Sequence, residues 1–327
     1  MLLYTDPCFL DHETGQHPEC AERLRAINRH LKSHSLFDRC ELRDCPSISL
    51  ERLVRVHAPE HAAQVAEFAA GGGGRIESDT IVSTESYDVA LRAAGAVSDA
   101  VERVVRGESD KALCLVRPPG HHAVQRSAMG FCLFNNIAIG ARTATHELDV
   151  DRVLIVDWDV HHGNGTQATF WEDEQVGFMS IHRWPFYPGS GAGDETGSDA
   201  GLGATLNIPI EFGTSRRTYF DTFTAKLETF AKRIRPQLVL ISAGFDSHRL
   251  DPIGSLGLET EDFSDLTDIV LRVAEEYAQG RVVSVLEGGY NTEILPHCVE
   301  LHLQHLLNAT VPRSAGSIGA TTWSLET

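Results

Sequence analysis

Short runs of apolar, largely β-branched residues recur along this 327-residue chain, and longer stretches with helical spacing separate them. Runs of this kind are typical of parallel strands that are buried on both faces of a sheet. The runs are 113–116 (LCLV), 153–156 (VLIV), 176–181 (VGFMSI), 205–208 (TLNI), 238–242 (LVLIS) and 282–286 (VVSVL). Because parallel strands are joined by right-handed crossovers, this alternation predicts an α/β fold with an open parallel sheet and helices on both faces.

Two of the intervening stretches show the helical period clearly. Between 85 and 106, apolar residues three and four apart form one stripe, which ends at Gly107. A second helix is expected to begin at Thr260, with acidic residues in its first turn, and to stop at Gly280. The glycine run 71–74 is interpreted as a flexible loop tip.

The chain shows no internal repeat and no shift in composition that would mark a linker. We therefore expect one domain over residues 1–308. The segment 309–327 lacks apolar periodicity, and we expect a loosely attached tail there.

Composition narrows the classes of partner. Apolar residues make up 42% of the chain, which is enough for a large core, and the net charge of -18 repels phosphate backbones and anionic lipid surfaces. No stretch approaches the roughly 20 apolar residues of a membrane span, and the first residues lack the basic flank of a signal peptide. The seven cysteines show no C-x-x-C spacing. We expect a soluble protein of a reducing compartment, the cytoplasm, that binds neither nucleic acid nor membranes.

Metal-binding side chains follow two of the apolar runs. Asp159 and His161 alternate in extended chain and so point the same way, while Asp157 lies one step deeper. Asp246 adds a second carboxylate from another strand end. Two carboxylates and one imidazole with an open fourth position are typical of a catalytic metal. Zinc is the first choice, and Fe(II), Co(II) and Mn(II) fit the same donors.

Two adjacent histidines, His121 and His122, follow the 113–116 run behind a Pro-Pro-Gly turn. Buried imidazoles need hydrogen-bond partners, and Asp157 and Asn164 are available. A carboxylate behind one imidazole favours its protonated form, whereas an amide behind the other leaves a neutral base. The pair therefore has the chemistry of a general base with a charged neighbour.

The last apolar run leads through Gly288 and Gly289 to Tyr290. A phenol at a strand end can donate to a developing oxyanion.

Five motifs, in this order, resemble the zinc-dependent histone deacetylases, most of all class II and bacterial deacetylase-like amidohydrolases. They are 117–123 (RPPGHHA), 130–136 (GFCLFNN), 156–167 (VDWDVHHGNGTQ), 242–254 (SAGFDSHRLDPIG) and 286–291 (LEGGYN). The N-terminal DHETGQHPECAER is similar as well, so the likeness runs from about residue 11 to 295. It implies the arginase/deacetylase fold and removal of acetyl or other acyl groups from lysine side chains of proteins or peptides.

The resemblance implies that Asp159, His161 and Asp246 bind one Zn²⁺ per chain. It makes His122 the general base and acid and His121 its electrostatic neighbour.

The resemblance also implies the roles of the residues around these groups. Asp157 supports His121, and Asn164 stands behind His122, where class I relatives carry aspartate. Tyr290 is similar to the tyrosine that polarises the substrate carbonyl.

Substrate contacts are implied in the same way. Phe131 and Tyr187 resemble the aromatic walls of an acyl-lysine channel, and Gly130 offers its carbonyl to the substrate amide N–H. Ile253 stands where one polyamine-selective relative has glutamate, which favours acyl-lysine. The family further implies a monovalent cation, K⁺, near four residues: Asp157, Asp159, His161 and Ser180.

Three alternatives remain open at this point. An acetylpolyamine amidohydrolase would act on small acylated amines with the same chemistry. A two-metal ureohydrolase on the same fold needs more carboxylates at the strand ends than Asp157, Asp159 and Asp246 supply. A non-catalytic acyl-lysine binding module is expected to have lost a ligand or the tyrosine, and none is missing.

Other histidines are interpreted as structural. His57 and His61 have i, i+4 spacing, but Pro59 interrupts the helix that a metal site would need. The same interpretation applies to five more: His12, His17, His30, His34 and His146.

Overall fold

The structure is a computed structural model that describes residues 1–308. Its centre is an eight-stranded sheet in the order β2-β1-β5-β10-β9-β6-β7-β8, and every neighbouring pair of strands is parallel. The strands are β1 (Leu2–Tyr4), β2 (Glu41–Arg43), β5 (Lys111–Cys114), β6 (Val153–Asp157), β7 (Val176–Arg183), β8 (Thr205–Ile210), β9 (Leu238–Ala243) and β10 (Val282–Leu286). The predicted open parallel sheet is confirmed.

Each of the six apolar runs contributes a strand, with small shifts at the ends. The 113–116 run begins earlier than expected, because β5 starts at Lys111 and ends at Cys114, although Leu115 and Val116 are also buried. The short strands β1 and β2 were not anticipated, and they add one edge to the sheet.

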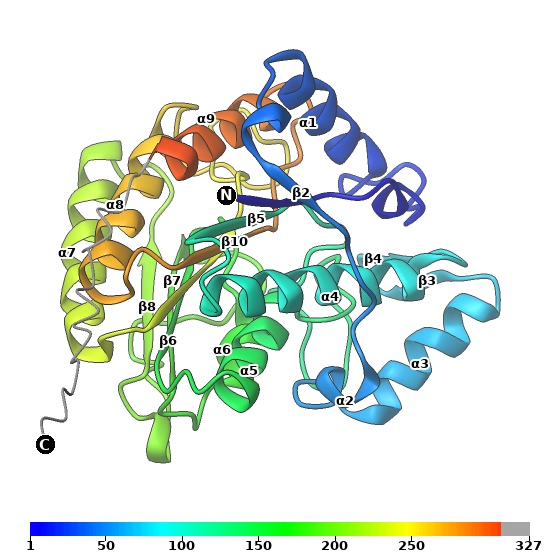
Figure 1. Cartoon of the computed structure of the whole chain (residues 1–327), viewed down its shortest axis with the longest axis horizontal. Helices are drawn as coiled ribbons and strands as arrows, with labels where there is room; N and C mark the ends of the chain where they lie inside the picture. Colours follow the sequence, from blue (N-terminus) through cyan, green and yellow to red (C-terminus); the bar gives the residue numbers. More distant parts are fainter. Residues whose placement is uncertain (309–327) are drawn as a thin grey trace, which may run out of the picture.

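Helices cover both faces of the sheet (Figure 1). α4 and α5 pack against one face, whereas α7, α8, α9 and α1 form the layer on the other. The helices are α1 (Ala21–Ser33), α2 (Leu50–Leu53), α3 (Pro59–Ala70), α4 (Ser86–Val105), α5 (Asn136–Glu147), α6 (Asn164–Thr169), α7 (Arg216–Ile234), α8 (Asp262–Tyr277) and α9 (Leu295–Asn308). Short 3-10 turns lie at Pro7–Leu10, Phe37–Arg39 and Asp199–Gly201.

The two helices expected from periodicity are present. α4 matches its predicted bounds within one residue at each end. α8 begins at Asp262, two residues after Thr260, and the apolar stripe of each helix is buried.

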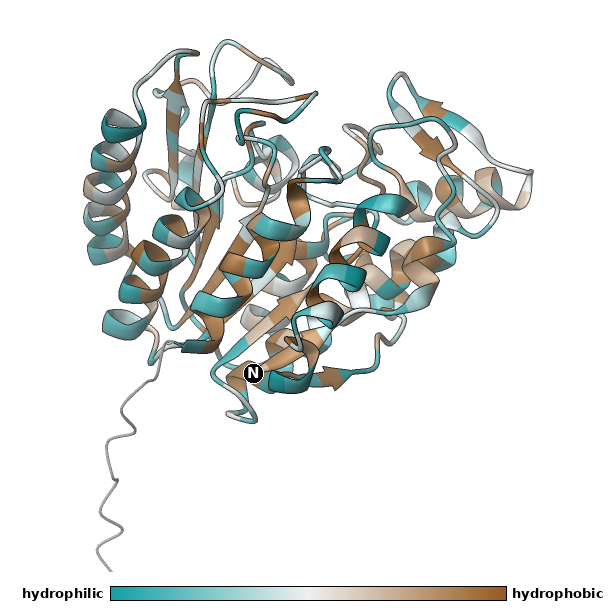
Figure 2. Ribbon diagram, turned by 90° about the horizontal axis from the view of Figure 1, so that it is seen from above, coloured by the Kyte–Doolittle hydropathy of each residue, from teal (hydrophilic) through white to brown (hydrophobic). Residues whose placement is uncertain are grey.

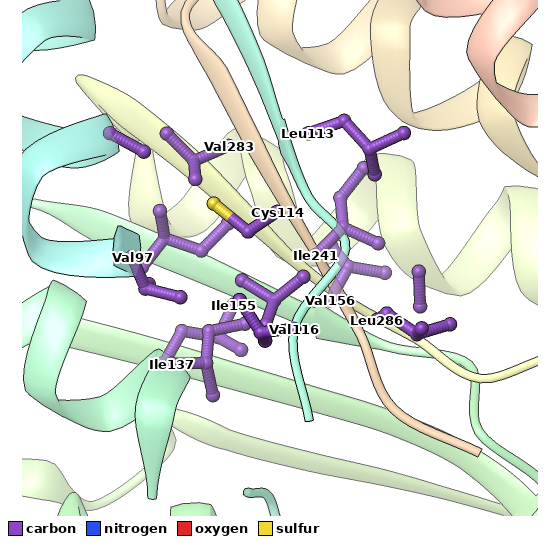
Figure 3. Packing of buried hydrophobic residues seen from close by; sticks show 14 of the residues in the cluster. Val97, Leu113, Cys114, Val116, Ile137, Ile155, Val156, Ile241, Val283 and Leu286 are labelled. Carbon is purple, nitrogen blue, oxygen red and sulfur yellow. The ribbon is translucent and has the colours of Figure 1, made fainter. Parts of the chain in front are cut away.

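The core lies between the sheet and these helices. Figure 3 shows Val97 of α4 and Ile137 of α5 beside Cys114 and Ile155 of the central strands. Figure 2 shows the helices alternating between hydrophobic and hydrophilic residues, as expected of elements with one face on a core. Burial of each such side chain stabilises the fold by about 1.5–3 kcal/mol.

A two-stranded antiparallel hairpin stands apart from the main sheet. It consists of β3 (Gly74–Glu77) and β4 (Thr80–Val82). The interpretation of 71–74 as a loop tip is therefore wrong for Gly74, which pairs with Val82. The tail predicted at 309–327 lies outside the described residues. Within residues 1–308, no helix combines the length and hydropathy needed to cross a membrane.

Candidate active site

Four adjacent strands deliver the predicted site residues. β5, β10, β9 and β6 are neighbours in the sheet although they are far apart in sequence. The carboxyl ends of these strands lie side by side at one end of the sheet. Open α/β sheets bind ligands beyond this end.

Asp159, His161 and Asp246 converge as expected. One ligand atom from each lies within 4.8 Å of the others, and all three residues are buried. His161 Nδ1 is 3.0 Å from Asp159 Oδ1 and 3.1 Å from Asp246 Oδ2. A single N–H cannot serve both carboxylates, and Asp246 Oδ2 has no hydrogen-bond partner among the described residues. This arrangement fits a divalent cation.

The remaining oxygens of the two carboxylates are already held by the backbone. Gly288 N donates to Asp159 Oδ2 (2.8 Å), and Val160 N donates to Asp246 Oδ1 (2.9 Å). A Cβ atom at residue 288 would lie 2.2 Å from Asp246 Oδ2, so only glycine fits there. Burial, together with the charge of Asp159, raises the pKa of Asp246 to about 7. A cation would relieve this repulsion between buried carboxylates.

The adjacent histidines lie beside this group with different partners. His121 Nδ1 lies 2.9 Å from Asp157 Oδ2, and His122 Nδ1 lies 2.7 Å from Asn164 Oδ1. Burial lowers the pKa of His121, but the carboxylates of Asp157, Asp159 and Glu287 together outweigh it, and the pKa rises to about 10. Burial and the neighbouring His121 hold the pKa of His122 well below its usual range. The pKa values of the two adjacent imidazoles are thus shifted in opposite directions.

Glu287 anchors the turn that carries this pair. Its buried carboxylate accepts the backbone N–H groups of Gly120 (2.7 Å) and His121 (3.2 Å) and the hydroxyl of Ser242 (3.1 Å). Glu287 belongs to the 286–291 motif, but the sequence indicated no role for it. Its contacts link β10 and β9 to the histidine turn.

A pocket of about 210 Å³ leads to these groups. It contains all four residues that were expected to contact substrate, together with Tyr290. The lining residues are Asp79, His122, Gly130, Phe131, His161, Phe186, Tyr187, Ile253 and Tyr290.

The floor of the pocket depends on one glycine. Gly130 has φ = 56°, and a Cβ there would lie 2.3 Å from the His122 ring. Phe131 follows with φ = 70°, and its ring meets Tyr290 edge-on at 5.6 Å between centroids. This backbone places Gly130 and Phe131 in the lining of the pocket, and the Gly130 carbonyl accepts from the Cys132 thiol (3.3 Å).

Two lining residues were missed. Asp79 lies in the turn of the β3–β4 hairpin, and its Oδ1 accepts the N–H of Gly130 (3.1 Å). Phe186 stacks on His161 with ring centroids 5.2 Å apart. An isolated aspartate in a loop gives no sequence signal, and Phe186 had a signal only in its proximity to Tyr187.

Ser180 lies on β7, directly beside Asp157 of β6. Its hydroxyl lies 2.9 Å from His182 Nδ1. The monovalent-cation group stays a prediction.

The N-terminal motif forms a buried ion network beneath the site. The Glu19 carboxylate accepts from Arg117 and from Arg23, and all three side chains are fully buried. Arg23 also donates to the carbonyl of Gly289 (2.6 Å), and its guanidinium lies 4.9 Å from the centre of the Tyr290 ring. The network ties the start of the chain to the loop that carries Tyr290.

His57 and His61 make structural contacts. His57 accepts from the backbone N–H of Asn135 (2.8 Å), and His61 donates to the carbonyl of Leu133 (2.9 Å). Pro59 is the first residue of α3, so His57 precedes the helix.

Comparison with known proteins agrees with this geometry. The family model for the histone deacetylase domain matches residues 17–306. The chain is 37% identical to a histone deacetylase-like amidohydrolase of Pseudomonas aeruginosa over 86% of this chain and 74% of that protein. It is 38% identical to the polyamine deacetylase HDAC10 of Homo sapiens, over 99% of this chain but 50% of that protein.

A solved structure leads to the same conclusion. The HDA15 HD domain superposes with a TM-score of 0.89 at 36% identity, over 94% of this chain and 91% of that one. The shared fold, the family model and the identity over most of the chain together show that the chain belongs to the histone deacetylase family.

Proposed function

We propose that this chain is a metal-dependent amidohydrolase that removes acetyl or other acyl groups from lysine side chains of proteins or peptides. Membership in the family supports hydrolysis of an acyl amide. The observation that carries the proposal is the pairing of His121 and His122, with opposite pKa shifts, beside the buried Asp159, His161 and Asp246 group.

The donor set supports zinc as the metal. A zinc-class ion bound by Asp159, His161 and Asp246 would lower the pKa of a water molecule and polarise the acyl carbonyl. The seven free thiols support a reducing compartment such as the cytoplasm.

The two histidines have different roles in the reaction: His122 transfers protons, and His121 stabilises charge. Because His122 Nδ1 donates to Asn164, its Nε2 is left to accept the proton of the attacking water. His122 then returns that proton to the departing amine. His121, held charged by Asp157, stabilises negative charge that develops nearby.

Tyr290 donates its O–H to the carbonyl oxygen as that oxygen gains charge. Burial raises the pKa of this phenol well above its usual range, so it keeps its proton at any working pH. Phe131 and Tyr187 flank the opening, where their rings suit a narrow alkyl stem.

The metal assignment is tested by replacing one ligand. Asp246→Asn preserves the size of the side chain and the acceptor for Val160 N, but it removes the charge. We expect loss of one equivalent of bound metal together with deacetylase activity, measured by elemental analysis and by release of acetate from an acetyl-lysine peptide. Full metal content in this variant would contradict the assignment of Asp246.

A second substrate class is favoured by the likeness to the human polyamine deacetylase. Ile253, which lines the opening with an apolar side chain, supports acyl-lysine over the polyamine. An apolar residue offers nothing to the distal ammonium of a polyamine. We therefore expect a higher kcat/KM for acetyl-lysine peptides than for N8-acetylspermidine.

Ile253→Glu tests this specificity, because a carboxylate in the pocket attracts a second ammonium more strongly than an exposed pair, which is worth about 0–1 kcal/mol. The ratio of the two kcat/KM values should shift toward the polyamine. Ile253→Gln is the matched control for size and polarity, and it should shift the ratio much less. A wild type that already prefers N8-acetylspermidine would instead support the polyamine function, and equal shifts in both variants would refute the role of charge at residue 253.

A further inference from the structure

Three potential metal ligands meet between α1 and α9, and none of them lines the pocket of the proposed active site. His30 lies on α1, and His297 and Glu300 lie on α9. One donor atom from each lies within 4.8 Å of the others. Figure 1 shows α1 and α9 side by side, although they are the first and last helices of the described chain.

The two helices fix the positions of these side chains. His297 and Glu300 are three residues apart on α9, so they project from the same face. Buried apolar residues flank them, Ile27 and Leu31 on α1 and Val299 on α9. The backbone positions are therefore set by helix packing, and only side-chain rotamers need to adjust to a ligand.

His30 contacts both of the other side chains. His30 Nε2 lies 2.5 Å from Glu300 Oε2, and the rings of His30 and His297 are 4.4 Å apart between centroids. The side chains of His30 and Glu300 are only 14% and 15% exposed. His297 is exposed. The cluster thus combines two largely buried donors with one exposed donor.

The chemistry of the set is specific. Two imidazoles and one carboxylate bind zinc in proteins, with water in the fourth position. Around tetrahedral zinc with bonds of about 2.0–2.1 Å, donor atoms stand roughly 3.3 Å apart, so a limit of 4.8 Å requires only small rotations. Magnesium and calcium prefer oxygen ligands and fit this set less well.

We propose that His30, His297 and Glu300 form a second divalent-metal site, selective for Zn²⁺ and similar borderline ions, that clips α1 to α9. A bound ion stabilises the folded state because the unfolded chain does not present the three donors together. The site is independent of the amide hydrolysis proposed above and does not take part in it.

The same helix provides a matched control. His305 of α9 lies 2.7 Å from Asp268, a histidine–carboxylate pair much like His30 and Glu300. It belongs to no group of three metal-binding side chains in the described residues. If His30 and Glu300 form only an ion pair, variants at His297 and at His305 should respond to Zn²⁺ alike. If His30, His297 and Glu300 bind a metal ion, only the His297 variant should lose Zn²⁺ binding.

The experiment measures Zn²⁺ stoichiometry by elemental analysis after dialysis at a buffered micromolar free Zn²⁺ concentration. We expect wild type and His305→Ala to bind one equivalent more than His297→Ala, and Glu300→Gln to bind that equivalent at least tenfold more weakly. Zn²⁺ should raise the Tm of His305→Ala more than that of His297→Ala. The kcat of His297→Ala should match that of wild type.

Equal stoichiometry in wild type and His297→Ala overturns the proposal. So does an equal Zn²⁺-dependent change of Tm in the two histidine variants. The result is separable from the proposed function, because Asp246→Asn loses activity with one equivalent of metal, whereas His297→Ala loses a different equivalent and keeps activity.

Discussion

Tyr290→Phe isolates a single hydroxyl of the site. The ring contacts are independent of this oxygen: Phe131 meets the ring edge-on, and the Arg23 guanidinium lies over it. The backbone N–H of Tyr290 donates to Asp251 Oδ2 (2.6 Å) in either case. Phenylalanine should therefore occupy the same place.

The size of the effect follows from what the hydroxyl does in the resting protein. No residue in the described part of the chain has a hydrogen bond to it, so its removal strands no buried partner there. The loss falls on the transition state, where one oxyanion donor contributes about 2.7–4 kcal/mol, or roughly 10²–10³ in kcat. The free energy of unfolding should change by less than about 1 kcal/mol. Surface substitutions typically change it by about 0.5 kcal/mol, and this variant should have an effect of similar size.

The assay is kcat on an acetyl-lysine peptide for wild type and Tyr290→Phe at matched metal content. Thermal unfolding of both proteins serves as the control for folding. A loss of kcat below tenfold would refute the role of Tyr290 as an oxyanion donor and leave it as a packing residue. A large loss of Tm would show that the ring contacts were misjudged.

Two further predictions concern charge. His122→Ala should lower kcat by at least 10², within the range for general acid–base catalysis, and His121→Ala should lower it less; the reverse order in steady-state kinetics would exchange their roles. Burial raises the pKa of Glu19, but Arg117, His12 and Arg23 together outweigh it and lower the value from 4.5 to about 2. Because the folded-state pKa is the lower one, the carboxylate stabilises the fold above pH 4.5, and this contribution is lost as the pH falls toward 2. Glu19→Gln should lower the free energy of unfolding by about 3–5 kcal/mol at neutral pH, measured by urea denaturation. The variant should also lose less stability than wild type as the pH falls below 4.5, and an unchanged pH dependence would contradict the ion-pair argument.

The sequence predicted what depends on local pattern. The strands at 153–156 and 238–242 are apolar for long enough to be recognised, and polar side chains at their ends had to meet because the strands are parallel. Asp159 and Asp246 were found in this way. β1 and β2 have only three residues each, which is too few to show a hydrophobic period. Their pairing with strands that are distant in the chain cannot be predicted from a short segment of sequence.

The parts that escaped prediction are contacts between distant loops and helices. Asp79 reaches the pocket only because a hairpin folds over Gly130. His30 was interpreted as structural because nothing within α1 points to a ligand. Its partners on α9 are about 270 residues away, and only the packing of the two helices brings them together.

The hydrogen bond from Arg23 to the carbonyl of Glu287 spans 264 residues, and this has a consequence for synthesis of the chain. During translation, the guanidinium emerges long before its acceptor exists, and the middle of the sheet stays incomplete until β10 has left the ribosome. Contacts of such sequence separation form late and slowly. A nascent chain should therefore hold β5 and β9 with an open seam between them, a surface that chaperones would have to protect until β10 closes it.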